Sequence, residues 1–295
     1  MTRPGDLNAK KLFFLSGLQQ NEVILYGRGE SSMRLHEKNK NFQWHSVSRP
    51  PTFLSTSQLG QYDEQGYILL KNCFSEDEIQ RVAKAIDPFE VEHEALLRSQ
   101  FNGKLFIAKA DAITFTLHLV TKTAVCRSFA LHPVFANLCQ DIIGPEARLY
   151  WDQAVYKKPG NPEEFPWHQD NGYTYTEPQQ YLTCWVPLSP ATVDNGCPWV
   201  LPGVHRGGTL HHDPVELGLS CTTDSEGAIP IEADIGDLVV FSSLTPHRTG
   251  PNLTRDVRKS YILQYAPNGA VVHAPDGQSV TPANDPERQF KILGH

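Results

Sequence analysis

Residues 165–171 read Phe165-Pro166-Trp167-His168-Gln169-Asp170-Asn171, and the pair His168 and Asp170 decides how the rest of the chain is interpreted. Successive side chains of an extended strand alternate faces, so residues two apart point the same way. An imidazole and a carboxylate can therefore converge on one point, as two ligands of a facial triad of two histidines and one carboxylate. Such a triad holds Fe(II) and leaves positions open for substrate and dioxygen. In a chain with 12 histidines, the pair alone does not establish a metal site.

The best candidate for a third ligand is His247, which follows the apolar run 238–241 and lies within the stretch 244–252. A histidine at the end of a buried strand is more often a hydrogen-bonded structural residue than a ligand. A matching H-x-D upstream, on another strand of the same barrel, reverses that expectation. We therefore expect His168, Asp170 and His247 to form one metal site.

Arg258 lies 11 residues past His247 (258 − 247), on a strand where Arg258 and Ser260 share a face. A guanidinium inside a barrel keeps its charge and is costly to bury alone, so it needs an anion. A carboxylate that accepts two parallel hydrogen bonds is the natural partner. An ion pair with an internal Asp or Glu is a structural alternative that the sequence leaves open.

Composition narrows the class of protein. The chain has 295 residues, with 26 basic and 33 acidic side chains and a formal charge of −7. Because no block of like charge occurs, nucleic acid and anionic membranes are poor candidates as partners. The six cysteines are scattered without a C-x-x-C pair, which favours free thiols over a disulfide framework. The apolar run 12–15 is too short for a membrane span. We expect a soluble, cytoplasmic protein, and the sequence does not indicate an oligomeric state.

The second half of the chain predicts a mainly β fold with flanking helices. Turn residues separate short apolar strands, which we expect at 149–157, 181–188, 197–201, 229–233, 237–241 and 258–265. Regular short strands with such turns indicate a jelly roll, with helices packed on one face.

Helices are expected mainly in the first half. Capping residues predict helices from Ser55 or Ser57 to Tyr62 and from Glu78 to about Ile86, and further helices are expected at 93–100 and 134–143. We expect an N-terminal arm of unknown role at 1–50 and a single domain at 51–295. This domain would comprise a helical layer (54–145), a jelly-roll core (146–266) and a C-terminal tail (267–295).

The order His168-x-Asp170, His247, Arg258 resembles that of the iron- and 2-oxoglutarate-dependent dioxygenases, and the surrounding motifs resemble their phytanoyl-CoA dioxygenase branch. The matching stretches are Tyr62-Asp63-Glu64-Gln65-Gly66-Tyr67, Tyr156-Lys157-Lys158-Pro159-Gly160, Trp167-His168-Gln169-Asp170, Asn195-Gly196-Cys197-Pro198-Trp199-Val200-Leu201-Pro202-Gly203-Val204-His205 and Pro246-His247-Arg248-Thr249-Gly250-Pro251-Asn252. Together they span about residues 54 to 266.

The resemblance implies a double-stranded β-helix, cupin-like, with Fe(II) held by His168, Asp170 and His247. It also implies that the cosubstrate 2-oxoglutarate chelates the iron and places its 5-carboxylate on Arg258, with Ser260 on the same face. Two further positions are implied as cosubstrate contacts. Trp185 sits where the branch has a tryptophan beside the cosubstrate, although a core aromatic residue explains it equally well, and Gln153 matches a contact position on the strand before the motif.

The implied reaction uses O2 to hydroxylate an unactivated C–H bond of a small organic metabolite, with release of succinate and CO2. Related halogenases have Ala or Gly where Asp170 stands, so we expect oxygenation here. An alternative uses the same oxidant for desaturation, epoxidation or ring closure. A non-catalytic barrel that binds a metal or ligand is a further alternative. A zinc hydrolase lacks support, because no H-E-x-x-H pattern supplies a base.

Substrate contacts are expected in the segments that leave the metal motif. Residues 171–176 should line the substrate mouth, which makes Tyr173, Tyr175 and Thr176 candidates. The loop 207–227, with His211, is expected to vary with the substrate. We interpret His211 and His212 as a solvated pair rather than a second metal site. Only scattered basic residues are present, so a compact metabolite is favoured over an acyl-CoA.

Overall fold

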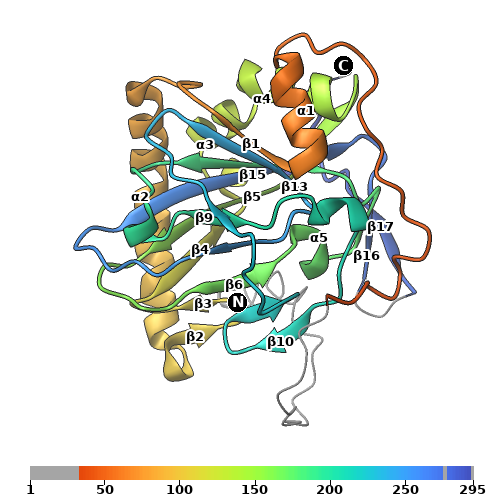
Figure 1. Cartoon of the computed structure of the whole chain (residues 1–295). Helices are drawn as coiled ribbons and strands as arrows, with labels where there is room; N and C mark the ends of the chain where they lie inside the picture. The colour runs from red at the N-terminus through yellow and green to blue at the C-terminus, as the bar shows by residue number, and fades with distance from the viewer. Residues whose placement is uncertain (1–32, 275–277, 294–295) are drawn as a thin grey trace, which may run out of the picture.

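The structure is a computed structural model that describes residues 33–274 and 278–293 (Figure 1). Its larger sheet comprises β1 (Tyr67–Leu70), β2 (Lys104–Leu105), β3 (Ala108–Lys109), β4 (Ile113–Leu117), β5 (Ala147–Lys157), β8 (Leu182–Pro187), β13 (Leu238–Ser242) and β15 (Arg258–Pro267). These strands lie in the order β1-β13-β8-β15-β5-β4-β3-β2, and every pair is antiparallel.

The smaller sheets complete the β structure. A four-stranded sheet has the order β12-β9-β14-β6 and is built from β6 (Phe165–His168), β9 (Pro198–Val200), β12 (Ile229–Pro230) and β14 (His247–Thr249). A hairpin joins β10 (Asp213–Val215) and β11 (Gly218–Ser220), and β7 (Thr176–Glu177) pairs with β16 (Val271–His273), which pairs with β17 (Val280–Pro282).

The eight-stranded and four-stranded sheets pack face to face around one apolar cluster. It contains Phe115, Val155, Trp185 and Ile262 from the larger sheet, together with Phe165 and Val200 from the smaller one. Alternation along each strand separates the two faces of the larger sheet: on β15, Arg258, Ser260 and Ile262 face this interior. The predicted jelly-roll core is therefore confirmed.

The opposite face of the larger sheet is covered by helices, as the sequence predicted. These are α1 (Thr56–Gln65), α2 (Glu76–Ser99), α3 (Ala124–Ala130) and α4 (Pro133–Ile142), and a short α5 (Asp170–Tyr173) follows β6 on the other side. One large cluster joins Ile79, Phe129 and Leu138 of these helices to Tyr261 and Leu263 of β15. The metal motif thus lies on the side of the larger sheet away from the helical layer.

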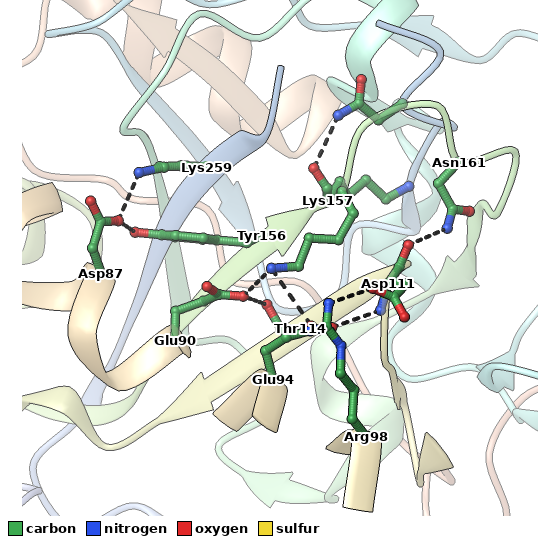
Figure 2. A network of polar contacts seen from close by, with 12 residues as sticks. Asp87, Glu90, Glu94, Arg98, Asp111, Thr114, Tyr156, Lys157, Asn161 and Lys259 are labelled. Atoms are coloured by element: carbon green, nitrogen blue, oxygen red, sulfur yellow. Dashed lines mark hydrogen bonds and ion pairs between the residues drawn. The ribbon is translucent and has the colours of Figure 1, made fainter. Parts of the chain in front are cut away.

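The prediction of two separate helices at 78–86 and 93–100 is wrong, because α2 runs unbroken from Glu76 to Ser99 through Pro88. Beyond Pro88 the buried face of α2 carries the carboxylates of Glu90 and Glu94, each 6% exposed. Because these residues are not apolar, the apolar periodicity of the helix cannot be followed past Pro88 in the sequence. The Thr114 hydroxyl donates to Glu90 at 2.9 Å (Figure 2). Lys158 pairs with both carboxylates. These polar contacts fasten α2 to β4 and to the end of β5.

Residues 33–50 run along the body of the protein without forming a helix or a named strand. Leu35 forms an isolated bridge with Leu210, and the Trp44 indole donates to Asp63 of α1 at 2.7 Å. The remainder of the predicted arm, residues 1–32, lies outside the described residues. All six cysteines are free thiols, as predicted. Within the described part of the chain, no helix combines the length and apolar character needed to cross a bilayer.

Candidate active site

The two histidines of the predicted triad are brought together by strand register. β6 and β14 are antiparallel neighbours, and His168 lies directly opposite His247. Their ring centroids are 4.1 Å apart. Asp170 begins α5 just beyond the end of β6, so its carboxylate reaches back to both rings. Its Oδ1 atom lies 4.0 Å from His168 Nε2 and 3.8 Å from His247 Nε2.

Hydrogen bonds within each strand fix the orientation of both imidazoles. His168 Nδ1 lies 2.8 Å from the carbonyl of Pro166, and His247 Nδ1 lies 3.0 Å from the carbonyl of Thr245. A carbonyl only accepts, so both Nδ1 atoms carry a proton, which leaves Nε2 of each ring as the atom that could ligate a metal. Burial, followed by the nearby His247, holds the pKa of His168 well below its usual value. His168 is therefore in the neutral form that ligates metals.

Asp170 is held by a residue that sequence reasoning missed. The Thr183 hydroxyl on β8 donates to Asp170 Oδ2 at 2.5 Å, which leaves Oδ1 directed at the two imidazoles. One signal was available, because Thr183 lies two residues before Trp185 and so shares its interior face. The three ligand atoms of His168, Asp170 and His247 lie within 4.8 Å of one another, and the group could hold a metal ion.

Gln169, between the two candidate ligands, is fully buried, and its side chain makes three hydrogen bonds to other segments. The Gln169 amide donates to the carbonyls of Gly208 at 3.1 Å and Leu244 at 2.6 Å, while its Oε1 accepts from the Leu210 backbone N–H at 2.6 Å. Gln169 therefore ties the H-x-D motif to the loop after β9 and to the segment that precedes His247.

The interpretation of His211 and His212 as a solvated pair is wrong for His212, which is buried. Its Nε2 accepts from the Gln169 backbone N–H at 2.8 Å, and its Nδ1 donates to the Leu210 carbonyl at 2.9 Å. Burial lowers the pKa of His212 to about 4, so the ring is neutral. Gly172 makes room for it, since a Cβ there would lie 2.0 Å from His212 Cε1. Sequence alone gives no signal for this contact between distant segments.

Arg258 is a buried cation without an acidic partner. Its side chain is 1% exposed, and its Nη1 donates to Ser260 Oγ at 2.7 Å, while Ser260 donates to the Val155 carbonyl. Nε and Nη2 have no hydrogen-bond partner among the described residues. Burial lowers the pKa of Arg258 to about 10. The alternative of an ion pair with an internal Asp or Glu is therefore not found in the described chain, and two directed donors await a ligand.

A second buried cation lies beside the first. Lys157 is the cross-strand neighbour of Arg258 and is 2% exposed. Its ammonium donates to the carbonyls of Glu163 and Thr249, each at 3.1 Å, and to that of Gly250. Burial and the charge of Arg258 lower its pKa well below the usual value. Two cations facing one interior would be offset by a dianionic ligand.

Other predicted site residues are placed as follows. The Trp185 ring lies 5.4 Å from the Arg258 guanidinium carbon, and Gln153 accepts a hydrogen bond from the Trp151 indole at 3.0 Å. Tyr173 packs edge-on against His168, with 5.3 Å between the rings. Thr176 lies 3.2 Å from the Tyr150 hydroxyl.

Two predicted substrate residues lie away from the triad. Tyr175 donates to the Lys38 carbonyl and stacks on His36, so it faces the N-terminal segment. His211 lies on the surface, 3.2 Å from Asp213. Neither Tyr175 nor His211 is in contact with the candidate metal ligands.

Known proteins resemble this chain in sequence and in fold. The family model described as "Phytanoyl-CoA dioxygenase (PhyH)" matches residues 62–260. A protein of Arabidopsis thaliana named "Phytanoyl-CoA dioxygenase" is 23% identical over 261 residues, which cover 76% of this chain and 92% of that protein. A "Methylphosphonate hydroxylase" of Gimesia maris is 28% identical over 220 residues, which cover 72% of this chain and 81% of that protein.

Among solved structures, the non-haem alpha-ketoglutarate-dependent carbocyclase SnoK from nogalamycin biosynthesis superposes with a TM-score of 0.60. It is 21% identical, and the match covers 79% of this chain and 94% of SnoK. At this identity the likeness concerns the fold, and the fold is the one predicted.

Proposed function

This chain belongs to the phytanoyl-CoA dioxygenase family, and from that premise we propose that it hydroxylates an unactivated C–H bond of a small organic metabolite. Its class is that of the iron- and 2-oxoglutarate-dependent dioxygenases, as the motifs predicted. The observation that carries the proposal is the buried Arg258, for which no acidic partner is found among the described residues. It lies inside the same barrel as the cluster of His168, Asp170 and His247.

The donor set fits the implied groups. Two neutral imidazoles and one carboxylate suit Fe(II), and a 2-oxoglutarate dianion would offset its charge and those of Arg258 and Lys157. His168, Asp170 and His247 would hold the metal. Arg258 would hold the distal carboxylate of the cosubstrate through its free Nε and Nη2 atoms. When bound, iron and 2-oxoglutarate supply the oxidising chemistry, in which O2 is consumed and succinate and CO2 are released.

The chain contributes positioning and exclusion of water. The Nδ1–H bonds orient both rings and leave each Nε2 as the atom that could ligate, and Thr183 fixes the Asp170 carboxylate. Ser260 fixes one arm of Arg258, and Trp185 lies beside its guanidinium. The apolar side chains of the interior cluster keep bulk water from this region. Tyr173, next to His168, is the predicted substrate residue that we place closest to the reaction.

The main alternative keeps the oxidant and changes the outcome. A fold neighbour is described as a carbocyclase, so the fold alone does not select hydroxylation over ring closure, desaturation or epoxidation. We propose a compact substrate, in keeping with the relative named methylphosphonate hydroxylase. A cytoplasmic location stays a prediction.

Product mass and succinate test these outcomes together. Enzyme, Fe(II), 2-oxoglutarate and ascorbate are incubated in air with a panel of small metabolites, with Asp170→Ala as control. Hydroxylation adds one oxygen to the product, whereas desaturation or ring closure removes two hydrogens. A chlorinated product in the presence of chloride would contradict the proposal. Absence of succinate across a broad panel would favour a non-catalytic binding barrel.

A further inference from the structure

Arg288 lies on a firmly held segment of the C-terminal tail. Arg127 donates to the Glu287 carbonyl and Arg148 donates to the Gln289 carbonyl, each at 2.6 Å. The segment is also tied to β5 through its backbone, since the Leu149 N–H donates to the carbonyl of residue 290 at 3.1 Å. The backbone on both sides of Arg288 is therefore held against β5 and α3.

In the Arg288 guanidinium, Nε and Nη1 have hydrogen-bond partners, and Nη2 has none among the described residues. Nε donates to Asp285 at 3.0 Å, and Nη1 lies 3.2 Å from His118 Nε2, which must accept because a guanidinium only donates. Burial, followed by the charge of Arg288, lowers the pKa of His118 to about 4, so this imidazole is neutral. Among the described residues, no hydrogen-bond partner is found for Nη2. The side chain is 37% exposed, so a ligand can reach it.

His118 connects Arg288 to the interior of the barrel. It has a left-handed backbone (φ 55°), a conformation that costs energy for a residue with a Cβ. Its ring lies 4.4 Å from that of Trp151, whose indole donates to Gln153. Trp151 pairs across the strands with Gln264, which pairs with Thr183, the residue that holds Asp170. The path from Arg288 to the metal ligands thus crosses the interior face of three adjacent strands.

Tyr150 lies within electrostatic reach of both ends of this path. Its hydroxyl lies 3.2 Å from Thr176, the backbone N–H of which donates to Asn171 beside the metal ligand Asp170. Burial is the largest cause that raises the pKa of Tyr150, and the hydrogen bond with Thr176 lowers it. The charge of Asp170 raises it further, and that of Arg288 lowers it. Tyr150 thus lies close to the segment that follows Asp170.

We propose that Arg288, backed by the neutral His118, forms a subsite for an anionic group of the substrate. The group is an oxyanion, either a carboxylate or a phosphonate or phosphate, and it is held by Arg288 while the carbon to be oxidised points toward Asp170. Arginine suits such a group because its guanidinium donates charge-assisted hydrogen bonds, here from Nη2. This inference rests on the proposed function and narrows its small metabolite to an acid.

Binding of simple anions tests the subsite without knowledge of the substrate. Protein saturated with Fe(II) and 2-oxoglutarate under nitrogen, so that Arg258 is already occupied, is titrated with acetate, methylphosphonate or neutral acetamide, at constant ionic strength set with chloride. Apparent dissociation constants come from the rise in melting temperature. We expect at least one anion to bind, acetamide not to bind, and Arg288→Gln to weaken anion binding at least tenfold. Arg81→Gln, an exposed arginine on α2, should bind as the wild type does.

A second variant separates recognition from a structural role of the tail. Asp285→Asn removes the ion pair between Arg288 and Asp285, as Arg288→Gln does, but keeps the guanidinium. Anion binding should therefore equal or exceed that of the wild type. Preference for acetate would indicate a carboxylate substrate, and preference for methylphosphonate would indicate a phosphonate or phosphate.

Three results would overturn the subsite: anions that bind no better than acetamide, Arg288→Gln that binds them as tightly as the wild type, or Asp285→Asn that loses binding equally. In each case an intact visible band of the iron and 2-oxoglutarate complex shows that the proposed function still stands. Absence of that band in the wild type would remove the proposed function and this inference with it.

Discussion

Thr183 Oγ lies 2.5 Å from Asp170 Oδ2, and this hydrogen bond ties the carboxylate of the triad to the larger sheet. Oδ1 then faces both imidazole Nε2 atoms, at 4.0 Å and 3.8 Å. The carboxylate is thus held in place by the protein before any ligand arrives. Outer hydrogen bonds of this kind orient metal ligands and raise metal affinity.

Thr183→Val keeps the shape of the side chain and removes the donor. We expect Fe(II) affinity to fall about 10- to 100-fold, the usual effect of losing such a partner. Anaerobic titration of metal-free protein measures it. Thr116→Val is the matched control, since the Thr116 hydroxyl on β4 is buried and finds no partner among the described residues. Equal metal affinity in the two variants would show that Asp170 needs no support from Thr183.

Gly172→Ala should disturb the metal site through His212. The new Cβ would lie 2.0 Å from His212 Cε1, so the imidazole must move and its bond to the Gln169 backbone N–H is lost. We expect a loss of about 1–3 kcal/mol in unfolding free energy, the usual cost of overpacking, together with weaker Fe(II) binding. Denaturant unfolding and metal titration measure the two effects. Gly207→Ala, where a Cβ meets nothing within 4 Å, should change neither; a similar loss there would point to a general effect of alanine in these loops.

Lys158→Met should destabilise the attachment of α2. It leaves the Glu90 carboxylate buried without its cation, whereas Glu94 keeps Arg98 at 3.2 Å. Breaking a buried pair in this way costs about 3–5 kcal/mol. Urea unfolding measures it, with the Lys84→Met variant of α2 as control. The double variant Glu90→Gln/Lys158→Met should recover part of the loss, because the unpaired charge of Glu90 is gone. No recovery would mean that the lysine acts through packing rather than charge.

His205 should make stability depend on pH. It is buried, donates through Nε2 to the Asp63 carbonyl, and has a pKa lowered by burial to about 4. In the unfolded chain a histidine titrates near pH 6.5. Between pH about 6.5 and 4 the unfolded state therefore binds a proton that the folded state does not. The contribution of His205 is present above pH about 6.5 and is lost as the pH falls toward 4, by at most about 3 kcal/mol.

His205→Gln retains a donor for Asp63 and cannot titrate, so its unfolding free energy should fall less than that of the wild type between pH 7 and pH 4. Urea unfolding at several pH values measures the difference. Parallel pH curves for the two proteins would contradict the assignment to His205.

The triad and Arg258 could be predicted because local rules position them. Residues two apart on a strand share a face, which gives Arg258 with Ser260. His168 ends β6 and Asp170 begins α5, so their convergence does not rest on strand alternation alone. The burial of Arg258 without an acidic partner could not be predicted, since it depends on what the neighbouring strands bring. The burial of Lys157 could not be predicted for the same reason. It lies in a motif that matches the family, but its three carbonyl partners come from other segments of the chain.

The difference between His211 and His212 shows why the substrate loop was harder. The two are adjacent, yet His211 meets Asp213 at the surface and His212 is buried against Gln169, and only the path of the loop decides which turns inward. The continuity of α2 was missed for a related reason, since its buried face changes from apolar residues to paired carboxylates. In both cases a polar residue is buried because of a partner far away in sequence.

The central claim is that one barrel binds Fe(II) through His168, Asp170 and His247 and 2-oxoglutarate through Arg258. Its most direct test is the weak visible charge-transfer band formed when Fe(II) and 2-oxoglutarate are added under nitrogen to metal-free protein, in the wild type, Asp170→Ala and Arg258→Gln. We predict a band in the wild type, a band in Arg258→Gln only at cosubstrate concentrations at least tenfold higher, and a weakened band in Asp170→Ala. Folded wild-type protein that gives no band, or an Arg258→Gln variant with unchanged cosubstrate affinity, would contradict the account.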